Sequence, residues 1–246
     1  TPKLAPHVCC GRPMISKGLL ERAREHARRN VDVLAPYAEQ GIPIIGLEPS
    51  CLLTLRDEYL DLLPNDPRAK LLAQNSFLIE EFIAARADEF SPLFSRPAIA
   101  ATSRSYDYPT TRPPDYSTTR PPDYSTTRLL FHAHCYQKAL TGTDSLLAML
   151  RLTGLDVAEI SSGCCGLAGS FGYEAEHYEL SMKIGEERLF PAVRAADGNT
   201  IIAASGMSCR HQIESGTGRM PLHPVEVLAE RLTLPPTATA MPFDGG

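Results

Sequence analysis

The sequence has no apolar run approaching the ~20 residues that a membrane-spanning helix needs. It also lacks an excess of basic charge, because the formal net charge is −5 and the pI is about 5.8. No basic stripe therefore favours nucleic-acid binding, and no signal-peptide pattern is visible. Hydrophobic residues make up 43% of the 246 residues. This content suits a soluble protein or docked subunit with one large or two small domains.

Two patterns that accompany redox cofactors are also missing. The chain contains neither a phosphate-cradling glycine loop nor a Cys-x2-Cys-x2-Cys run. It therefore shows no flavin-binding or ferredoxin-type segment. The chain begins at Thr1 without a methionine, and we expect it to be a piece of a longer polypeptide.

What the chain does contain is a repeated cysteine pattern. Two Cys-Cys-Gly triplets occupy residues 9–11 and 164–166, and a lone cysteine follows each triplet at a similar distance. Adjacent cysteines do not easily bridge to each other, and disulfide frameworks belong mainly to small secreted chains. Clustered thiolates are instead typical ligands of soft metals, with iron–sulfur clusters and zinc as the leading candidates. We call Cys9, Cys10 and Cys51 the first set, and Cys135, Cys164, Cys165 and Cys209 the second set.

The first half reads as helices around one short strand. Helical spacing of apolar residues predicts a helix from Ser16, its N-cap, to about Gly41, with Pro36 as a kink or last turn. The run 42–47 predicts a buried parallel strand that places Cys51 near its carboxyl end. Two further helices are expected at about 50–60 and 66–86.

The second half alternates strands and helices. Strands are expected at 129–134, 155–160 and 199–204, and helices at 143–152, 173–190 and 224–232. Such alternation favours βαβ units and a parallel sheet, so the fold class is α/β. Each cysteine position of the second set follows a strand, so one edge of the sheet can gather all four thiols.

A low-complexity segment separates the halves. Thr-Thr-Arg recurs at 110–112, 118–120 and 126–128, with Pro-Pro-Asp-Tyr between the copies. The proline density favours an extended, disordered insertion, with a ligand-binding strip as the alternative. The predicted organisation is a first unit at 1–99, an insertion at 100–128, a second unit at 129–234 and a disordered tail at 235–246.

Four segments carry a family resemblance. These are residues 9–13, 46–51, 134–139 and 163–172, which resemble the cysteine-rich CCG domain. That domain occurs in heterodisulfide reductase and in iron–sulfur subunits of glycolate oxidase and anaerobic glycerol-3-phosphate dehydrogenase. It also forms the carboxyl end of FAD-linked D-lactate or D-2-hydroxyglutarate dehydrogenases, the group that this chain resembles most. The resemblance implies two pseudo-repeated CCG halves, the first of them truncated at its N-terminus.

The resemblance also implies an electron-transfer function. In such enzymes a flavin oxidises a 2-hydroxy acid, ferredoxin-type clusters carry the electrons, and the CCG domain passes them towards a quinone or another acceptor. The chain would then be an oxidoreductase component, cytoplasmic and peripheral to the inner face of the membrane. Its partners would be a flavoprotein domain that holds FAD and a ferredoxin-type cluster domain.

The fullest form of the family has five cysteines per repeat, and this chain departs from it. Thr54 and Gln212 stand where the last cysteine of each repeat would fall. The second set retains four thiols, enough for one 4Fe-4S-type cluster. We therefore expect the second set to bind that cluster, and the first set to contribute or to line the same cleft.

Other residues near the cysteines have candidate roles. Gly166 and Gly169, with Gly163 and Gly172, are expected to let the backbone approach the cluster and donate N–H groups to sulfur. Arg210, like Arg12, could stabilise a reduced cluster or lie free on the surface. Four histidines could ligate zinc or relay protons, although such residues are more often satisfied in loops: His132, His134, His211 and His223.

Two other functions fit the cysteines. Four sulfurs suit a structural zinc ion. The thiols could also cycle through a disulfide, as in thiol oxidoreductases.

Overall fold

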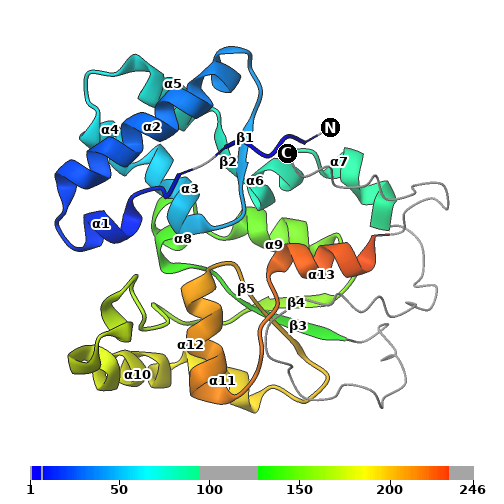
Figure 1. Cartoon of the computed structure of the whole chain (residues 1–246). Helices are drawn as coiled ribbons and strands as arrows, with labels where there is room; N and C mark the ends of the chain where they lie inside the picture. The colour runs from blue at the N-terminus through cyan, green and yellow to red at the C-terminus, as the bar shows by residue number, and fades with distance from the viewer. Residues whose placement is uncertain (1, 7, 95–126, 233–246) are drawn as a thin grey trace.

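The computed structural model describes residues 2–6, 8–94 and 127–232 of the chain. The polypeptide forms two α/β halves that stack on each other (Figure 1). Of the insertion predicted at 100–128, all but Thr127 and Arg128 lies outside the described residues, as does the tail predicted at 235–246. Within the described residues, no helix is long and apolar enough to cross a membrane.

The first half contains short helices around a small parallel sheet. β1 and β2 pair in parallel, with Ile44 opposite Ser76. The helix that leaves β1 begins with Pro49, and Glu48 caps it by accepting a hydrogen bond from the Ser50 N–H. The elements are α1 Arg12–Ser16, α2 Leu20–Glu39, β1 Ile44–Gly46, α3 Pro49–Arg56, α4 Glu58–Leu62, α5 Pro67–Gln74, β2 Ser76–Leu78, α6 Ile79–Ala84, α7 Ala87–Phe90 and the 3-10 helix η1 Ser91–Phe94.

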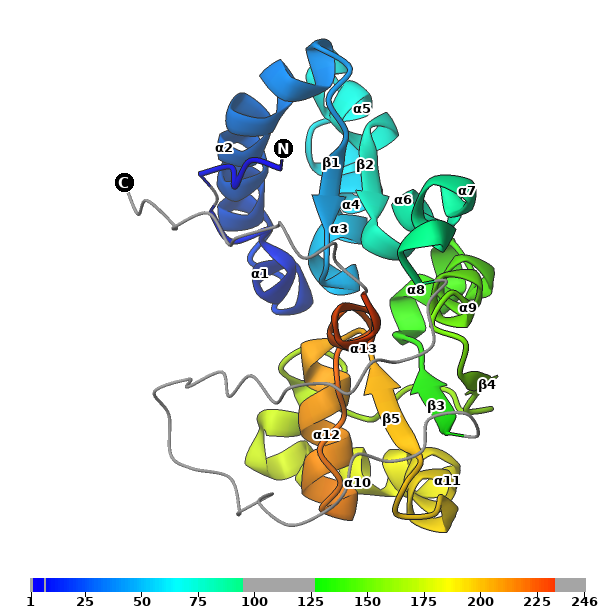
Figure 2. The same ribbon diagram turned by 90° about the vertical axis from the view of Figure 1, so that its right-hand side faces the viewer.

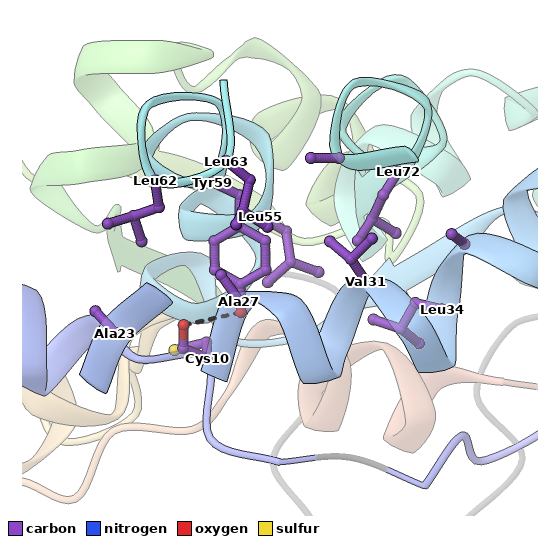
Figure 3. Close-up of a cluster of buried hydrophobic side chains, with 12 residues drawn as sticks. Cys10, Ala23, Ala27, Val31, Leu34, Leu55, Tyr59, Leu62, Leu63 and Leu72 are labelled. Atoms are coloured by element: carbon purple, nitrogen blue, oxygen red, sulfur yellow. Dashed lines mark hydrogen bonds between the residues drawn. The ribbon is translucent and has the colours of Figure 1, made fainter. Parts of the chain in front are cut away.

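One face of α2 forms the core of this half. Ala23, Ala27 and Val31 recur at helical spacing and are completely buried. They pack in the same cluster as Tyr59 of α4 and Leu72 of α5 (Figure 3). Burial of each large apolar side chain contributes about 1.5–3 kcal/mol. The predicted apolar stripe is therefore confirmed at these positions.

Several local predictions for this half are wrong. Ser16 ends α1 instead of capping the long helix. Pro36 lies inside α2 near its end at Glu39, which agrees with its predicted place in a last turn. Ile45 and Leu47 are 38% and 52% exposed, because β1 has a paired strand on one side only among the described residues. The helix predicted over 66–86 is interrupted by β2, which begins directly after α5.

The second half has a three-stranded parallel sheet in the order β4-β3-β5. The three predicted strands are thus confirmed. The helix predicted over 173–190 is instead two 3-10 turns followed by two helices. The elements are β3 Arg128–His132, α8 Cys135–Leu140, α9 Asp144–Arg151, β4 Asp156–Glu159, η3 Phe171–Tyr173, η4 Ala175–His177, α10 Tyr178–Glu187, α11 Leu189–Ala195, β5 Ile201–Ala204, α12 Met207–Thr217 and α13 Pro224–Arg231.

The two halves repeat one structural unit. In the first half β1 leads to α3, and the chain returns to pair β2 in parallel beside β1. In the second half β5 leads to α12, and the chain returns at Leu222, which bridges in parallel to Ala203. Cys51 is the third residue of α3, and Cys209 is the third residue of α12. The repeat seen in the cysteine spacing is therefore also a repeat of strand and helix.

The carboxyl ends of the two sheets face each other across the junction between the halves (Figure 2). Hydrogen bonds connect the loops at these strand ends. The Met207 N–H donates to Glu48 Oε2 at 2.8 Å, and His223 Nε2 lies 3.0 Å from the Leu47 carbonyl oxygen. Cys51 and Cys209 lie in the first turns of the helices that follow these loops, α3 and α12. Both cysteine sets therefore lie near the junction.

A buried polar chain also crosses the junction. Gln137 Nε2 donates to Glu80 Oε1 at 2.7 Å, and the Ser205 hydroxyl donates to Gln137 Oε1 at 3.2 Å. All three side chains are at most 2% exposed. Burial raises the pKa of Glu80 to about 7, because its charged form loses hydration.

This carboxyl group makes stability depend on pH. The folded state holds the Glu80 proton more tightly than the unfolded chain, so the free energy of unfolding should fall as pH rises from about 4.5 to 7. The effect is on the order of 3 kcal/mol at most. Glu80→Gln should remove this component. Urea unfolding at pH 5 and pH 8 measures it, with the exposed Glu214→Gln as control. An equal pH dependence in Glu80→Gln and wild type would contradict the assignment.

Candidate metal centre

The carboxyl ends of three parallel strands position the second set. Cys135 begins α8 after β3, Cys164 and Cys165 lie in the loop after β4, and Cys209 lies in α12 after β5. Their thiols contact one another in the order Cys135, Cys164, Cys165, Cys209. The structure thus gathers the four residues that the sequence predicts at this edge.

The pKa values of these thiols alternate along the chain of contacts. Hydrogen bonding to the neighbouring sulfur raises the pKa of Cys135 and Cys165 and lowers that of Cys164 to about 2 and that of Cys209 well below its usual range. Neighbouring negative charges oppose each other's ionisation. All four sulfurs can therefore be thiolates together only when a positive centre compensates their charge.

Backbone N–H groups point at the sulfurs of the second triplet. The Gly166 N–H donates to Cys164 Sγ over 3.3 Å, and the Ala168 N–H also bonds this sulfur. The Leu167 N–H bonds Cys165. Positive φ angles at Gly166 (108°) and Ala168 (42°) turn the loop around the sulfur. Such a nest of N–H groups stabilises negative charge, as in iron–sulfur sites.

Glycine is required at position 166. A Cβ atom there would lie 2.1 Å from the Ser181 carbonyl oxygen. Of the other glycines predicted to donate to sulfur, Gly172 gives its N–H to the Leu167 carbonyl oxygen instead. Gly169 also has a positive φ and lies beside Ser16 of the first half. The sequence prediction missed Ala168, since no residue type marks it as a donor.

The first set repeats part of this arrangement. The Gly11 N–H donates to Cys9 Sγ over 3.5 Å, and the Arg12 N–H bonds the Cys10 sulfur. Each triplet sulfur in both halves thus accepts from the N–H two residues later. The Cys10 and Cys51 thiols are in contact, and their hydrogen bond raises the pKa of Cys10 and lowers that of Cys51.

Tyr59 fixes the first triplet to the core. Its hydroxyl donates to the Cys10 carbonyl oxygen at 2.9 Å, the dashed line in Figure 3. Asn30 Nδ2 donates both to the Tyr59 hydroxyl and to the Cys9 carbonyl oxygen. These bonds hold the backbone that carries both thiols. The described contacts join Cys9, Cys10 and Cys51 to one another, and none of them joins this group to a sulfur of the second set.

The residues that replace the family's last cysteines have structural contacts. Thr54 Oγ1 donates to the Ser50 carbonyl oxygen at 2.7 Å, and Gln212 Nε2 donates to the Ser181 carbonyl oxygen at 3.1 Å. Arg210 donates to the carbonyl oxygens of Ala204 and Ser205. Its guanidinium therefore orders the loop before α12, and its predicted effect on a cluster stays a prediction.

Arg12 lies at the junction between the halves. It pairs with Glu58, and its guanidinium stacks on the Tyr136 ring, 4.4 Å from the centroid. The Tyr136 hydroxyl in turn donates to Asp57 Oδ2 at 3.0 Å. Because Tyr136 follows Cys135, these contacts tie the second set to α3 and α4 of the first half.

The sulfurs do not form a closed zinc site. Among the residues that the structure describes, one group of three or more possible metal ligands brings a ligand atom from each residue within 4.8 Å of the others. This group is Glu174, Glu176 and His177, and it contains no cysteine. Lys17 and His177 already pair with Glu174. A tetrahedral zinc ion holds four sulfurs at about 2.3 Å and so needs them as compact as this. An iron–sulfur cluster also takes four cysteine thiolates as ligands, so the four thiols gathered at the strand ends match its donor set.

The fold and these thiols define a cysteine-rich α/β protein with two repeated sulfur-bearing units. A sequence profile described as "Cysteine-rich domain" (CCG) matches residues 1–56 and 129–214. The chain belongs to this family.

Curated relatives cover nearly the whole chain. It is 27% identical over 231 residues to one subunit of the anaerobic glycerol-3-phosphate dehydrogenase of Escherichia coli K12, covering 93% of this chain and 50% of that protein. It is 29% identical over 231 residues to "D-2-hydroxyglutarate dehydrogenase" of the same organism, covering 93% of the chain and 19% of that protein. The chain thus spans half of the first relative and about a fifth of the second.

The low pKa of Cys164 predicts its reactivity in metal-free protein. Cys164 is half-buried and lines a cavity of about 260 Å³. Because its pKa is lowered to about 2, iodoacetamide should react with it at nearly the same rate at pH 5 and pH 7. An ordinary thiol reacts faster by roughly tenfold per pH unit in this range. Peptide mass spectrometry follows each cysteine. A hundredfold faster reaction of Cys164 at pH 7 would contradict the lowered pKa.

Proposed function

We propose that the chain is the iron–sulfur electron-transfer module of an FAD-dependent 2-hydroxy-acid dehydrogenase. The observation that carries this proposal is the row of four thiols, each in contact with the next, with N–H donors to both sulfurs of the triplet. The names of the curated relatives support it, because they are dehydrogenases or dehydrogenase subunits. D-lactate, glycolate or D-2-hydroxyglutarate would be the substrate of the parent enzyme.

In this proposal Cys135, Cys164, Cys165 and Cys209 hold one cluster of the 4Fe-4S type. The bound cluster would accept and release single electrons. The protein groups orient it: the N–H donors of Gly166, Leu167 and Ala168 stabilise negative sulfur. Cys9, Cys10 and Cys51 lie at the same junction and either contribute to ligation or line the cleft.

The proposed order of electron carriers places this module between a donor and an acceptor. A flavoprotein domain holding FAD and a ferredoxin-type cluster domain would deliver electrons, and a quinone or another acceptor would receive them. This assigns the chain to the cytoplasmic side, peripheral to the inner face of the membrane. The module would be an oxidoreductase component without catalytic residues of its own.

The domain boundaries of the proposal are 1–99 and 129–234 for the two CCG units, with 100–128 as insertion and 235–246 as tail. The repeated order of strand, cysteine-bearing helix and returning strand supports the two units. β3 begins at Arg128, one residue before the proposed start of the second unit at 129.

The content of iron, zinc and acid-labile sulfide in anaerobically purified protein tests the function. About four iron atoms and four sulfides per chain are expected. Zinc without sulfide would favour a structural zinc module. Reversible loss of free thiols in protein without metal would favour a disulfide-cycling function.

Serine variants test the ligand set. Cys165→Ser should abolish the visible absorbance and the bound sulfide, because a buried ligand of the second set is lost. Cys51→Ser should retain the chromophore, since its thiol contacts only the first set in the described structure. Absorbance and metal analysis of both variants provide the measurement. Full colour in Cys165→Ser would overturn the assignment of the second set.

A further inference from the structure

His132 stands beside the second set without being part of the predicted ligand set. It is the last residue of β3, opposite Ala204 in the register with β5, and its side chain is completely buried. Cys209, on the helix after β5, contacts the His132 ring and is 1% exposed. The imidazole therefore lies against a thiol of the proposed centre.

The hydrogen bonds of His132 determine its tautomer. Nδ1 lies 2.8 Å from the Ser162 hydroxyl oxygen, and this hydroxyl donates its proton to the Ile160 carbonyl oxygen. When the Ser162 hydroxyl donates to Ile160, its oxygen accepts a hydrogen bond from His132 Nδ1–H. In the neutral ring Nε2 consequently carries a lone pair and no proton.

This Nε2 atom is fully buried, and no oxygen or nitrogen atom of the described residues bonds it. The Cys209 thiol shares a hydrogen bond with the ring instead. Metal binding deprotonates such a thiol and leaves the imidazole lone pair free to act as a ligand. Metal-bound histidines typically donate their other ring N–H to an oxygen atom that fixes the ring orientation. The contact from Nδ1 to Ser162, backed by Ile160, is such an arrangement.

We propose that His132 Nε2 is a nitrogen ligand of the metal centre held by the second set. This inference rests on the proposed function, because it requires that a metal centre is bound there. Imidazole nitrogen and thiolate sulfur are compatible ligands for iron and for zinc. His132 would then act as a nitrogen donor beside the thiols of the second set.

The other histidines near the sulfurs differ from His132. His134 Nδ1 accepts from the Tyr136 N–H, and the ring lies against Gly206. His223 Nδ1 accepts from the Val225 N–H, so its Nε2–H donates to the Leu47 carbonyl oxygen. Both nitrogens of His223 are thus occupied. It serves as the control, since His223→Asn retains a side chain that caps α13.

A neutral nitrogen ligand has a defined electronic effect. Histidine in place of cysteine removes one negative charge from the centre and raises its reduction potential, as in clusters with mixed ligation. His132→Cys should therefore lower the potential measured by redox titration. His132→Gln, which cannot provide the imidazole lone pair, should remove nitrogen ligation.

The decisive test is pulsed electron paramagnetic resonance on the reduced wild-type protein, prepared anaerobically with ¹⁵N-labelled histidine. We expect the strong nitrogen coupling of a directly bound imidazole, its absence in His132→Gln and its retention in His223→Asn. The wild-type result does not depend on whether a variant folds. An iron–sulfur signal without strongly coupled nitrogen would overturn the role of His132 alone. Wild-type protein without iron and sulfide would overturn the proposed function as well.

Discussion

The electrostatic coupling of the clustered thiols is the constraint on which the rest of the structure depends. Four cysteines whose thiols contact one another in a row cannot all ionise without a compensating positive centre, and the pKa directions of Cys135, Cys164, Cys165 and Cys209 alternate accordingly. The surrounding backbone favours negative sulfur. Gly166 has a positive φ and no room for a side chain, and its N–H faces the Cys164 sulfur. The loop therefore holds N–H groups against its sulfurs, while Cys165 and Leu167 also pack in the hydrophobic core of the second half.

The two halves place this chemistry at their junction. Short parallel strands end where the two sheets face each other, and β1, β3, β4 and β5 each lead to a cysteine-bearing loop or helix (Figure 2). The buried chain from Glu80 through Gln137 to Ser205 ties the halves together just behind the second set, because Gln137 is two residues after Cys135. The second set of cysteines and the interface between the halves are thus parts of one structural unit.

The features that can be predicted from the sequence are those that depend on the order of strands and cysteines along the chain. β3, β4 and β5 were predictable because each is a short run rich in apolar residues followed by a cysteine, and the carboxyl ends of parallel strands meet at one edge. β2 was missed because Ser76, Phe77 and Leu78 continue an apolar helical pattern and their pairing with β1 depends on tertiary structure. The lone pair on His132 Nε2 was equally invisible, since it depends on where Ser162 donates its proton.

Anomalous diffraction at the iron absorption edge tests the central claim most directly, on crystals grown from anaerobically purified protein. If the second set binds an iron–sulfur cluster, a strong iron peak is expected among its thiols, within bonding distance of Cys209 and of His132 Nε2. Absence of iron there, with the four thiols either bound to zinc or paired as disulfides, would contradict it.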